Sequence, residues 1–284
     1  MRLTKQKSLR LFGKLELIWP SSQIYKKKPE YGDTILEARN IVVEFGAIKA
    51  VDRASISIKK GSIVGLIGPN GAGKTSLLNV ISGFYKPKEG VVLFKGVDIT
   101  KLPIHARARL GIARTFQHME LFKHMTVLEN IMVGLEPWRK YRHLESMIWI
   151  GRARRWEEEA MERAEVVIDL LDLHEYRDKI VGGLPPGVQK RVDLARALVQ
   201  EPELVLMDEP MAGLTREEKE DIARAIIEVY ETRGTTFLLV EHDLEAIMDL
   251  CERVIAMDSG RVIAEGTPEE IASNPQVIAA YMGE

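Results

Sequence analysis

The sequence predicts an α/β protein with a central, mainly parallel sheet, an antiparallel β subdomain and a helical subdomain. Three features of the sequence indicate this arrangement. Short apolar runs beside glycine turns come first, continuous apolar runs of strand length recur later, and amphipathic helical patterns lie between them. Strands that alternate with helices are typical of α/β folds.

The antiparallel region is expected near the start of the fold. Three short runs there have strand composition: Ile35–Phe45, Ala54–Ile58 and Val91–Phe94. A glycine follows the first run and another precedes the last (Gly46 and Gly90). Short strands bounded by turn residues favour antiparallel pairing.

Four continuous apolar runs suit strands that are covered on both faces. They are Ile63–Ile67, Leu204–Met207, Thr236–Val240 and Val254–Met257. In parallel sheets that are buried on both sides, strands lack the alternation of apolar and polar residues. The four runs are therefore expected to form the central sheet.

Helices are predicted from apolar periodicity and from capping signals. In Arg154–Leu173 the apolar positions fall on one face, opposite Glu157–Glu159. Thr215 and Glu218 have the spacing of a capping box before a second apolar stripe. A last helix is expected to start at Thr267–Glu270, with threonine as the cap and proline at the first helical position.

The chain is predicted to have a basic N-terminal extension, residues 1–34, and one folded domain, residues 35–284, in which about 117–197 form the helical subdomain. Lys14 and Glu16 interrupt the apolar stretch of the extension, so it lacks the core of a secretory signal. Two interpretations stay open for the extension: a solvated tail, or a contact with anionic headgroups. No apolar run reaches the roughly 20 residues that span a bilayer.

Composition narrows the class of protein. The formal net charge of −2 gives no electrostatic reason to expect nucleic acid as a partner. The single cysteine, Cys251, cannot form an intrachain disulfide, which indicates a reducing cytoplasmic setting.

A glycine-rich pattern for binding phosphate follows the run Ile63–Ile67. It consists of Gly68, Pro69, Asn70, Gly71, Ala72, Gly73, Lys74 and Thr75, and it continues into Ser76 and an apolar helix. The strand, the loop and the helix match the G-x-x-x-x-G-K-[ST] motif in its required context. The glycines let backbone N–H groups face phosphate oxygens, Lys74 supplies a cation for the β- and γ-phosphates, and Thr75 supplies a hydroxyl for Mg²⁺. The motif predicts that the chain binds ATP with Mg²⁺.

Two acidic residues end the apolar run Leu204–Met207. A buried strand that delivers carboxylates at its C-terminal end fits the ligand-binding edge of an open α/β sheet. Asp208 is predicted to hold Mg²⁺, directly or through water, and Glu209 to orient and deprotonate the attacking water. The alternative is that these acids only cap a strand.

The order of these motifs resembles the ABC (ATP-binding cassette) ATPase family, a branch of the P-loop NTPases, over residues 35–284. The resemblance implies three more site residues. Phe45 would stack on adenine, Gln117 would reach Mg²⁺ and the attacking water, and His242 would bond the γ-phosphate. Without the resemblance, Phe45 would be assigned to the core and His242 to a polar loop.

The segment that matches the family signature, usually Leu-Ser-Gly-Gly-Gln, departs from it and is Leu184–Gln189 here. Gly187 stands at the second glycine and would approach the γ-phosphate of the ATP bound by the opposing subunit. Pro185 replaces the serine, and Pro186 removes a backbone donor. Losing one charge-stabilised hydrogen bond costs about 1.5–3 kcal/mol, which predicts closure about 10- to 100-fold weaker. The two prolines also stiffen the loop, which would offset that loss.

Further segments are similar to ATPase subunits of branched-chain amino acid importers, the hydrophobic amino acid uptake group. They are 111–117, 125–130, a basic insert over Trp138–Trp156, and the ending Asn274–Glu284. The resemblance implies an ATP-hydrolysing subunit that powers import of branched-chain amino acids or a related small solute. Its partners would be transmembrane permease subunits, a second ATPase subunit (homo- or heterodimer) and, indirectly, an extracytoplasmic solute-binding protein. Its place would be peripheral, at the cytoplasmic face of the inner (plasma) membrane.

Two other functions stay open. One is a soluble, non-transport ABC ATPase that acts on DNA or the ribosome, although the sequence has no second cassette, long coiled coil or zinc-binding cysteines. The other is a nucleotide-binding regulatory subunit with weak hydrolysis, which the prolines of the signature favour and which Glu209 and His242 argue against.

Overall fold

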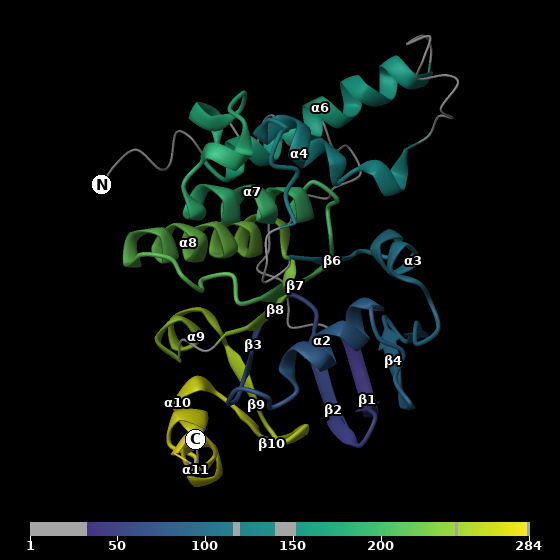
Figure 1. The fold of residues 1–284 in the computed structure, drawn as a ribbon, viewed down its shortest axis with the longest axis vertical. Helices are drawn as coiled ribbons and strands as arrows, with labels where there is room; N and C mark the ends of the chain where they lie inside the picture. The colour runs from purple at the N-terminus through teal and green to yellow at the C-terminus, as the bar shows by residue number, and fades with distance from the viewer. Residues whose placement is uncertain (1–32, 116–119, 140–151, 242–243, 283–284) are drawn as a thin grey trace. The chain divides into compact units, whose positions relative to one another are not determined.

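The structure, a computed structural model, describes residues 33–115, 120–139, 152–241 and 244–282. The predicted N-terminal extension and most of the predicted basic insert lie outside them. The described residues form two compact units, and each is considered by itself (Figure 1). The sheet unit contains 33–115, 202–241 and 244–282, and the helical unit contains 120–139 and 152–201. The limits predicted for the helical subdomain, about 117–197, stay a prediction.

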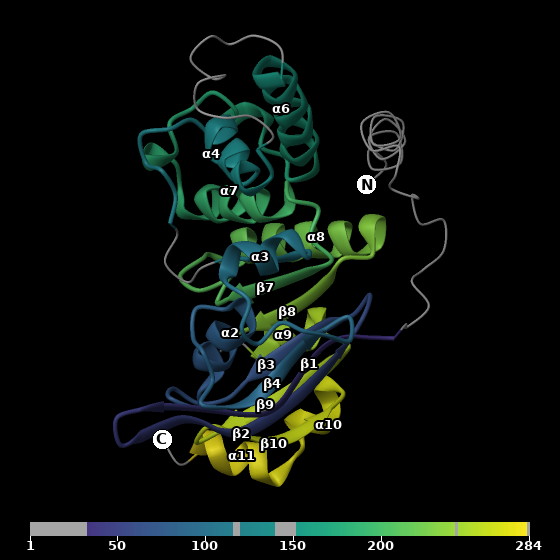
Figure 2. The same ribbon diagram turned by 90° about the vertical axis from the view of Figure 1, so that its right-hand side faces the viewer.

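An antiparallel sheet opens the sheet unit, as the sequence predicts. Its strands are β1 (Thr34–Phe45), β2 (Ile48–Lys59), β4 (Glu89–Phe94) and β5 (Val97–Asp98), in the order β2-β1-β4-β5 (Figure 2). Strand β2 is longer than the expected Ala54–Ile58. Arg53 has a φ of 54°, and this irregularity interrupts the alternation of apolar and polar residues in the strand. The first half of β2 therefore lacks the pattern that predicts a strand.

A six-stranded sheet forms the centre of the same unit, in the order β10-β9-β3-β8-β7-β6. Its strands are β3 (Ile63–Ile67), β6 (Ile112–Arg114), β7 (Leu204–Asp208), β8 (Thr236–Val240), β9 (Arg253–Asp258) and β10 (Arg261–Gly266). All neighbours are parallel except β10, which pairs antiparallel at the edge. Every residue of β3, β7 and β8 is buried, which confirms the prediction from their apolar runs.

Six helices of the sheet unit connect or flank these strands. They are α2 (Lys74–Ser82), α3 (Ile104–Arg109), α8 (Arg216–Arg233), α9 (Leu244–Leu250), α10 (Pro268–Ala272) and α11 (Pro275–Met282). Both predicted capping boxes, at Thr215 and Thr267, are present. The expectation of one last helix is wrong, because α10 ends at Ala272. Asn274 then accepts hydrogen bonds from the N–H groups of Gln276 and Val277 and starts α11.

The helical unit contains α4 (Val127–Val133), α6 (Arg152–Leu170) and α7 (Pro186–Leu198), with short 3-10 turns at Glu136–Trp138, His174–Tyr176 and Val181–Gly183. Helix α6 ends three residues before the expected Leu173, because Asp172 has a φ of 52° and turns the chain. Among the helices of the described residues, none has the length and the apolar character needed to cross a bilayer.

The core of the sheet unit lies between the antiparallel sheet, helix α2 and the central strands. Its buried cluster includes Leu36 and Ile58 from the first sheet, Leu77 and Ile81 from α2, and Leu206 from β7. Because α2 is packed on both sheets, the loop that precedes it is held at the carboxyl end of β3.

Candidate nucleotide-binding site

The phosphate loop is packed between two strands that leave no room for a side chain at Gly68 or Gly73. Gly68 has a φ of 150°, and a Cβ there would lie 2.1 Å from the Met257 carbonyl oxygen of β9. Gly73 has a φ of 97°, and a Cβ there would lie 2.3 Å from the Ala50 carbonyl oxygen of β2. Both distances are shorter than any real contact, so only glycine fits at these two positions.

Lys74 is only 5% exposed and points back across the loop that precedes it. Its Nζ donates to the carbonyl oxygens of Gly68, at 2.6 Å, and Pro69, at 2.9 Å. The lysine is also the first residue of α2, where helix N–H groups and the helix dipole favour an anion. A loop whose path two glycines permit, a buried ammonium and a helix N-terminus together fit the phosphates of a nucleotide.

The acidic end of β7 meets the phosphate loop at Thr75. The Thr75 hydroxyl donates to Oδ1 of Asp208 at 3.3 Å, and Asp208 is 2% exposed. Hydroxyl and carboxylate oxygens are ligands that Mg²⁺ accepts, and Mg²⁺ commonly binds one or two protein oxygens together with substrate phosphates. The described residues contain no cluster of three or more acidic, histidine or cysteine side chains that could cage a metal alone. The donor set therefore fits Mg²⁺ bound with a nucleotide.

Arg114 forms an ion pair with Asp208, from its Nη2 to Oδ2 at 3.2 Å. Burial raises the pKa of Asp208, and Arg114 and the Thr75 hydroxyl oppose that shift. Burial also lowers the pKa of Arg114. Sequence reasoning named Arg114 only as part of the motif before Gln117 and missed this contact, because the two residues are 94 positions apart.

Glu209 directly follows β7 and is half-buried, with a φ of 49°. Its N–H donates to the Val240 carbonyl oxygen of β8 at 2.8 Å. The next contact along the same loop is from the Met211 N–H to Oε1 of the buried Glu241, at 2.7 Å. Two hydrogen bonds from the end of β8 thus fix the loop that carries Glu209 in a left-handed conformation that non-glycine residues rarely adopt. No motif or spacing in the sequence predicts this role for Glu241.

Phe45 ends β1 and is 48% exposed, so the alternative that it belongs to the core is wrong. Its ring packs edge to face against Tyr85, which follows α2. An aromatic ring that is half exposed and supported from one side can accept a flat, stacked partner. Sequence reasoning also missed Tyr85.

Two predicted catalytic residues, Gln117 and His242, lie outside the described residues, and their roles stay predictions. Gly187 is the second residue of α7, after Pro185 as the N-cap and Pro186 at the first helical position. No side chain caps this helix. Instead, the side chain of Gln189 contacts the start of the signature segment, where its Nε2 donates to the Leu184 carbonyl oxygen at 2.8 Å.

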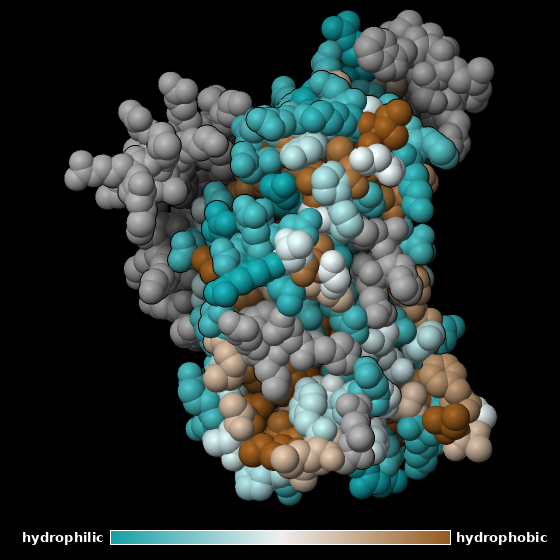
Figure 3. All heavy atoms as spheres, turned by 60° about the vertical axis from the view of Figure 1, so that its left-hand side comes forward, coloured by the Kyte–Doolittle hydropathy of each residue, from teal (hydrophilic) through white to brown (hydrophobic). Residues whose placement is uncertain are grey.

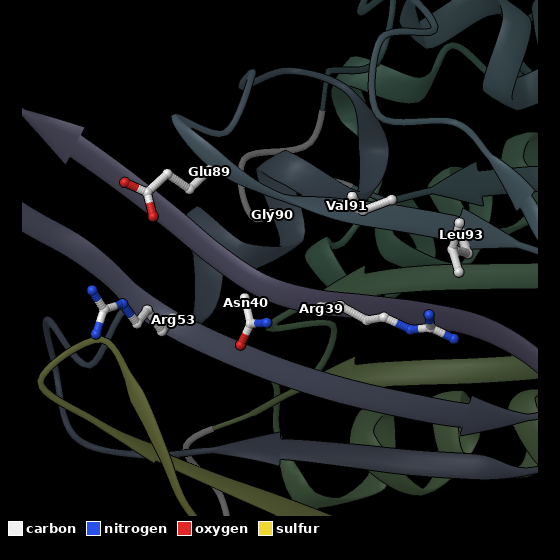
Figure 4. A pocket seen from close by; sticks show the side chains of 7 residues that line it. All are labelled: Arg39, Asn40, Arg53, Glu89, Gly90, Val91 and Leu93. Carbon is white, nitrogen blue, oxygen red and sulfur yellow. The ribbon is translucent and has the colours of Figure 1, made fainter.

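The antiparallel sheet has a hollow of about 620 Å³ that contains none of the predicted site residues (Figure 4). It lies where β1 shifts its register with β2 and β4. Arg39 points away from Arg53 and Glu89, and it forms an ion pair with Glu37 at 2.6 Å. The lining carries charges of both signs. The hollow coincides with the register shifts of β1, and we assign it no ligand.

The phosphate loop, the acidic strand end and the two sheets define a nucleotide-binding cassette of the P-loop class. A family model for ABC transporters matches residues 51–212, and a model for the branched-chain amino acid ATP-binding cassette transporter matches residues 261–284. The chain therefore belongs to the ABC transporter family, as an ATP-binding subunit whose ATP hydrolysis is coupled to transport.

Similar proteins cover nearly the whole folded domain. The branched-chain amino acid transport ATP-binding proteins LivG of Escherichia coli and BraF of Pseudomonas aeruginosa are each 38% identical, over 88% of this chain and 98% of theirs. A nucleotide-free cassette from an ABC transporter superposes with a TM-score of 0.78 at 37% identity, over 89% of this chain and all of the other. A dimeric cassette bound to ADP and phosphate superposes with a TM-score of 0.69 at 28% identity, over 82% of this chain and 98% of the other.

Proposed function

We propose that this chain hydrolyses Mg-ATP to drive import of branched-chain amino acids or a related small solute. The observation that carries the proposal is the hydrogen bond between Thr75 of the phosphate loop and Asp208, with Glu209 next in the chain. The solute is proposed from the names of the relatives and from the C-terminal match over residues 261–284.

Each residue of the site has a role in this reaction. The loop N–H groups and Lys74 bind the β- and γ-phosphates. To do so, Lys74 replaces its hydrogen bonds to the Gly68 and Pro69 carbonyl oxygens with bonds to phosphate oxygens. Thr75 and Asp208 hold Mg²⁺, whose charge would neutralise the phosphates. Glu209 orients the attacking water and accepts its proton. Phe45 stacks on adenine. Gln117 reaches Mg²⁺ and the attacking water, and His242 bonds the γ-phosphate.

The transporter complex would need two kinds of partner for this chain. A second ATPase, identical or related, would cover the bound ATP with its own signature segment, and Gly187 would do the same in return. A dimeric structural neighbour supports such a pair. This chain would work at the cytoplasmic face of the inner membrane, and an extracytoplasmic protein would deliver solute to the permeases on the opposite side.

An apolar patch on the helical unit is a candidate docking surface for a permease. Phe122 is 49% exposed, Met125 37% and Ile180 57%. The Met125 carbonyl oxygen accepts from the Val181 N–H at 3.0 Å, so the three side chains come from neighbouring segments. Apolar groups interrupt the hydrophilic surface on the face that Figure 3 shows. We propose the contact here because exposed apolar side chains on neighbouring segments are typical of interaction sites.

The decisive experiment is size-exclusion chromatography of Glu209→Gln with and without Mg-ATP, alone and with a second ATPase from the same transporter. Slowed hydrolysis should trap a closed dimer. Uptake of labelled leucine by the reconstituted transporter tests the solute, and Glu209→Gln should abolish it. ATP binding without dimer formation in either sample, or uptake that persists in the variant, contradicts the proposal.

A nucleotide-binding regulatory subunit with weak hydrolysis is the second candidate, because α7 lacks the side-chain cap that a serine would provide. Restoring the usual residues with Pro185→Ser and Pro186→Gly distinguishes the two candidates. A gain of about 10-fold or more in ATP-driven dimer formation would favour the regulatory role for the natural sequence. An unchanged or weaker dimer would show that the stiff proline segment closes adequately.

A further inference from the structure

We propose that Arg114 is a positioning residue for the magnesium site and that it presets the carboxylate of Asp208. The inference rests on the proposed function, in which Asp208 holds Mg²⁺. It gives a role to a residue that touches neither the nucleotide nor the attacking water in the proposed reaction.

Arg114 and Asp208 end two neighbouring parallel strands. Arg114 is the last residue of β6, where it pairs with Leu206, and Asp208 is the last residue of β7. Their side chains are 8% and 2% exposed, and the guanidinium lies 3.2 Å from Oδ2. An arginine in such a place offers a rigid, planar set of donors, which a lysine does not.

The guanidinium is itself held by helix α2, which also carries Thr75. Its Nη1 donates to Oδ1 of Asn79 at 2.6 Å and to Oγ of Ser82 at 2.7 Å. The ring of Phe84 lies 5.3 Å from the guanidinium carbon. Arg114 therefore links the carboxylate at the end of β7 to the C-terminal half of the phosphate-loop helix.

The two oxygens of Asp208 consequently have different partners. Oδ1 accepts from the Thr75 hydroxyl, and Oδ2 faces Arg114. Because Thr75 is a proposed magnesium ligand, Oδ1 is the oxygen on the metal side. By holding Oδ2, Arg114 fixes the torsion of the carboxylate and keeps Oδ1 directed at the cation. Losing a residue that orients a metal ligand typically lowers metal affinity about 10- to 100-fold.

Arg107 offers a matched control. It is 2% exposed and is bonded to the same end of α2, with Nη1 donating to the carbonyl oxygens of Val80, at 2.6 Å, and Ile81, at 2.7 Å. Its other acceptors are the carbonyl oxygens of Thr100 and Leu102, so its hydrogen bonds go to the backbone and not to Asp208. If the role of Arg114 were only structural, the loss of either arginine would have the same kind of effect.

The test uses the full-length chain with Glu209→Gln to block hydrolysis. ATP affinity is measured in EDTA, and the affinity of the ATP-bound protein for Mn²⁺ is measured by electron paramagnetic resonance. We expect Arg114→Met to leave the EDTA affinity within about 2-fold and to lower the Mn²⁺ affinity about 10-fold or more. Arg107→Met should lower the unfolding temperature and leave the Mn²⁺ affinity unchanged.

Unchanged Mn²⁺ affinity in Arg114→Met, or an equal loss in Arg107→Met, would overturn the proposal. Arg114→Lys keeps the positive charge without the planar set of donors and serves if Arg114→Met does not fold. Arg114→Lys should also have a lower Mn²⁺ affinity. An unchanged Mn²⁺ affinity in this variant would argue against positioning by the guanidinium. If the Glu209→Gln parent itself fails to bind Mn²⁺ with ATP, the proposed function is wrong and this inference is lost with it.

Discussion

The rings of Phe45 and Tyr85 contact each other edge to face, with 5.3 Å between their centroids and 74° between their planes. Phe45 ends β1, and Tyr85 lies two residues after Gly83, the C-cap of α2. Tyr85 is anchored independently of the ring contact, because its N–H donates to the Asn79 carbonyl oxygen at 3.0 Å. The phosphate-loop helix thus supports the aromatic residue proposed to stack on adenine.

Removing the ring of Tyr85 should weaken nucleotide binding. An edge-to-face pair contributes about 0.5–1.5 kcal/mol, so Tyr85→Ala should raise the dissociation constant for ATP about 2- to 10-fold. Tyr85→Phe keeps the ring contact and should bind as the natural protein does. Calorimetric titration of both variants with ATP measures the effect. Equal affinities for Tyr85→Ala and Tyr85→Phe would show that Phe45 needs no support.

A side chain at Gly73 should be far more damaging than one at Gly71. Both glycines have a positive φ, but a Cβ at Gly73 meets the Ala50 carbonyl oxygen whereas nothing lies within 4 Å of one at Gly71. Gly71→Ala carries only the cost of the backbone conformation, about 1 kcal/mol, and Gly73→Ala adds a steric clash of about 2 kcal/mol or more. Urea unfolding gives both values. Similar losses in the two variants would contradict the packing argument.

Glu241 should affect hydrolysis more than binding. Its carboxylate accepts from the Met211 N–H, two residues after Glu209. Glu241→Ala leaves that buried donor without its acceptor at a cost of about 1–3 kcal/mol and loosens the loop. We expect kcat to fall about 10-fold with ATP affinity unchanged, and Glu241→Gln, which retains an oxygen acceptor, to recover most of the rate. Steady-state ATPase assays separate the two constants, and a change confined to KM would refute this role.

The thiol of Cys251 should be unreactive in the folded protein. Burial raises its pKa from the ordinary 9.0 to about 12, so the folded state keeps the proton while an unfolded chain loses it near pH 9. The stabilisation is therefore complete below about pH 9 and is lost as the pH rises toward 12. A thiol reagent at about pH 8 should label the protein only after unfolding. The stability difference from Cys251→Ala should shrink by about 1 kcal/mol between about pH 8 and about pH 10.

The sequence predicts best what is encoded locally. The phosphate loop, the buried strands and the capping boxes at Thr215 and Thr267 depend on residues within a few positions of each other, and the structure confirms the strands and the caps. The break between α10 and α11 carried a local signal that was missed. Asn274 and Pro275 repeat the cap-and-proline pattern of Thr267 and Pro268.

The contacts that support the site could not be predicted in this way. Arg114 meets Asp208 across 94 positions, and Glu241 meets Met211 across 30. Such pairs are set by which strands become neighbours in the sheet, and the order β8-β7-β6 follows from the packing of the whole unit. No spacing or motif in the sequence predicts either of these two contacts.

The two carboxylate oxygens of Asp208 have different partners, and this difference affects which divalent ion the proposed site would bind. Calcium prefers six to eight oxygen ligands and often binds both oxygens of one carboxylate. Magnesium needs near-octahedral geometry and can bind a single carboxylate oxygen. In the proposed magnesium site, with Oδ2 facing Arg114, Asp208 would offer a cation a single oxygen. The ion pair would thereby disfavour calcium without any selective cage, and an arginine that touches neither ion would discriminate between them.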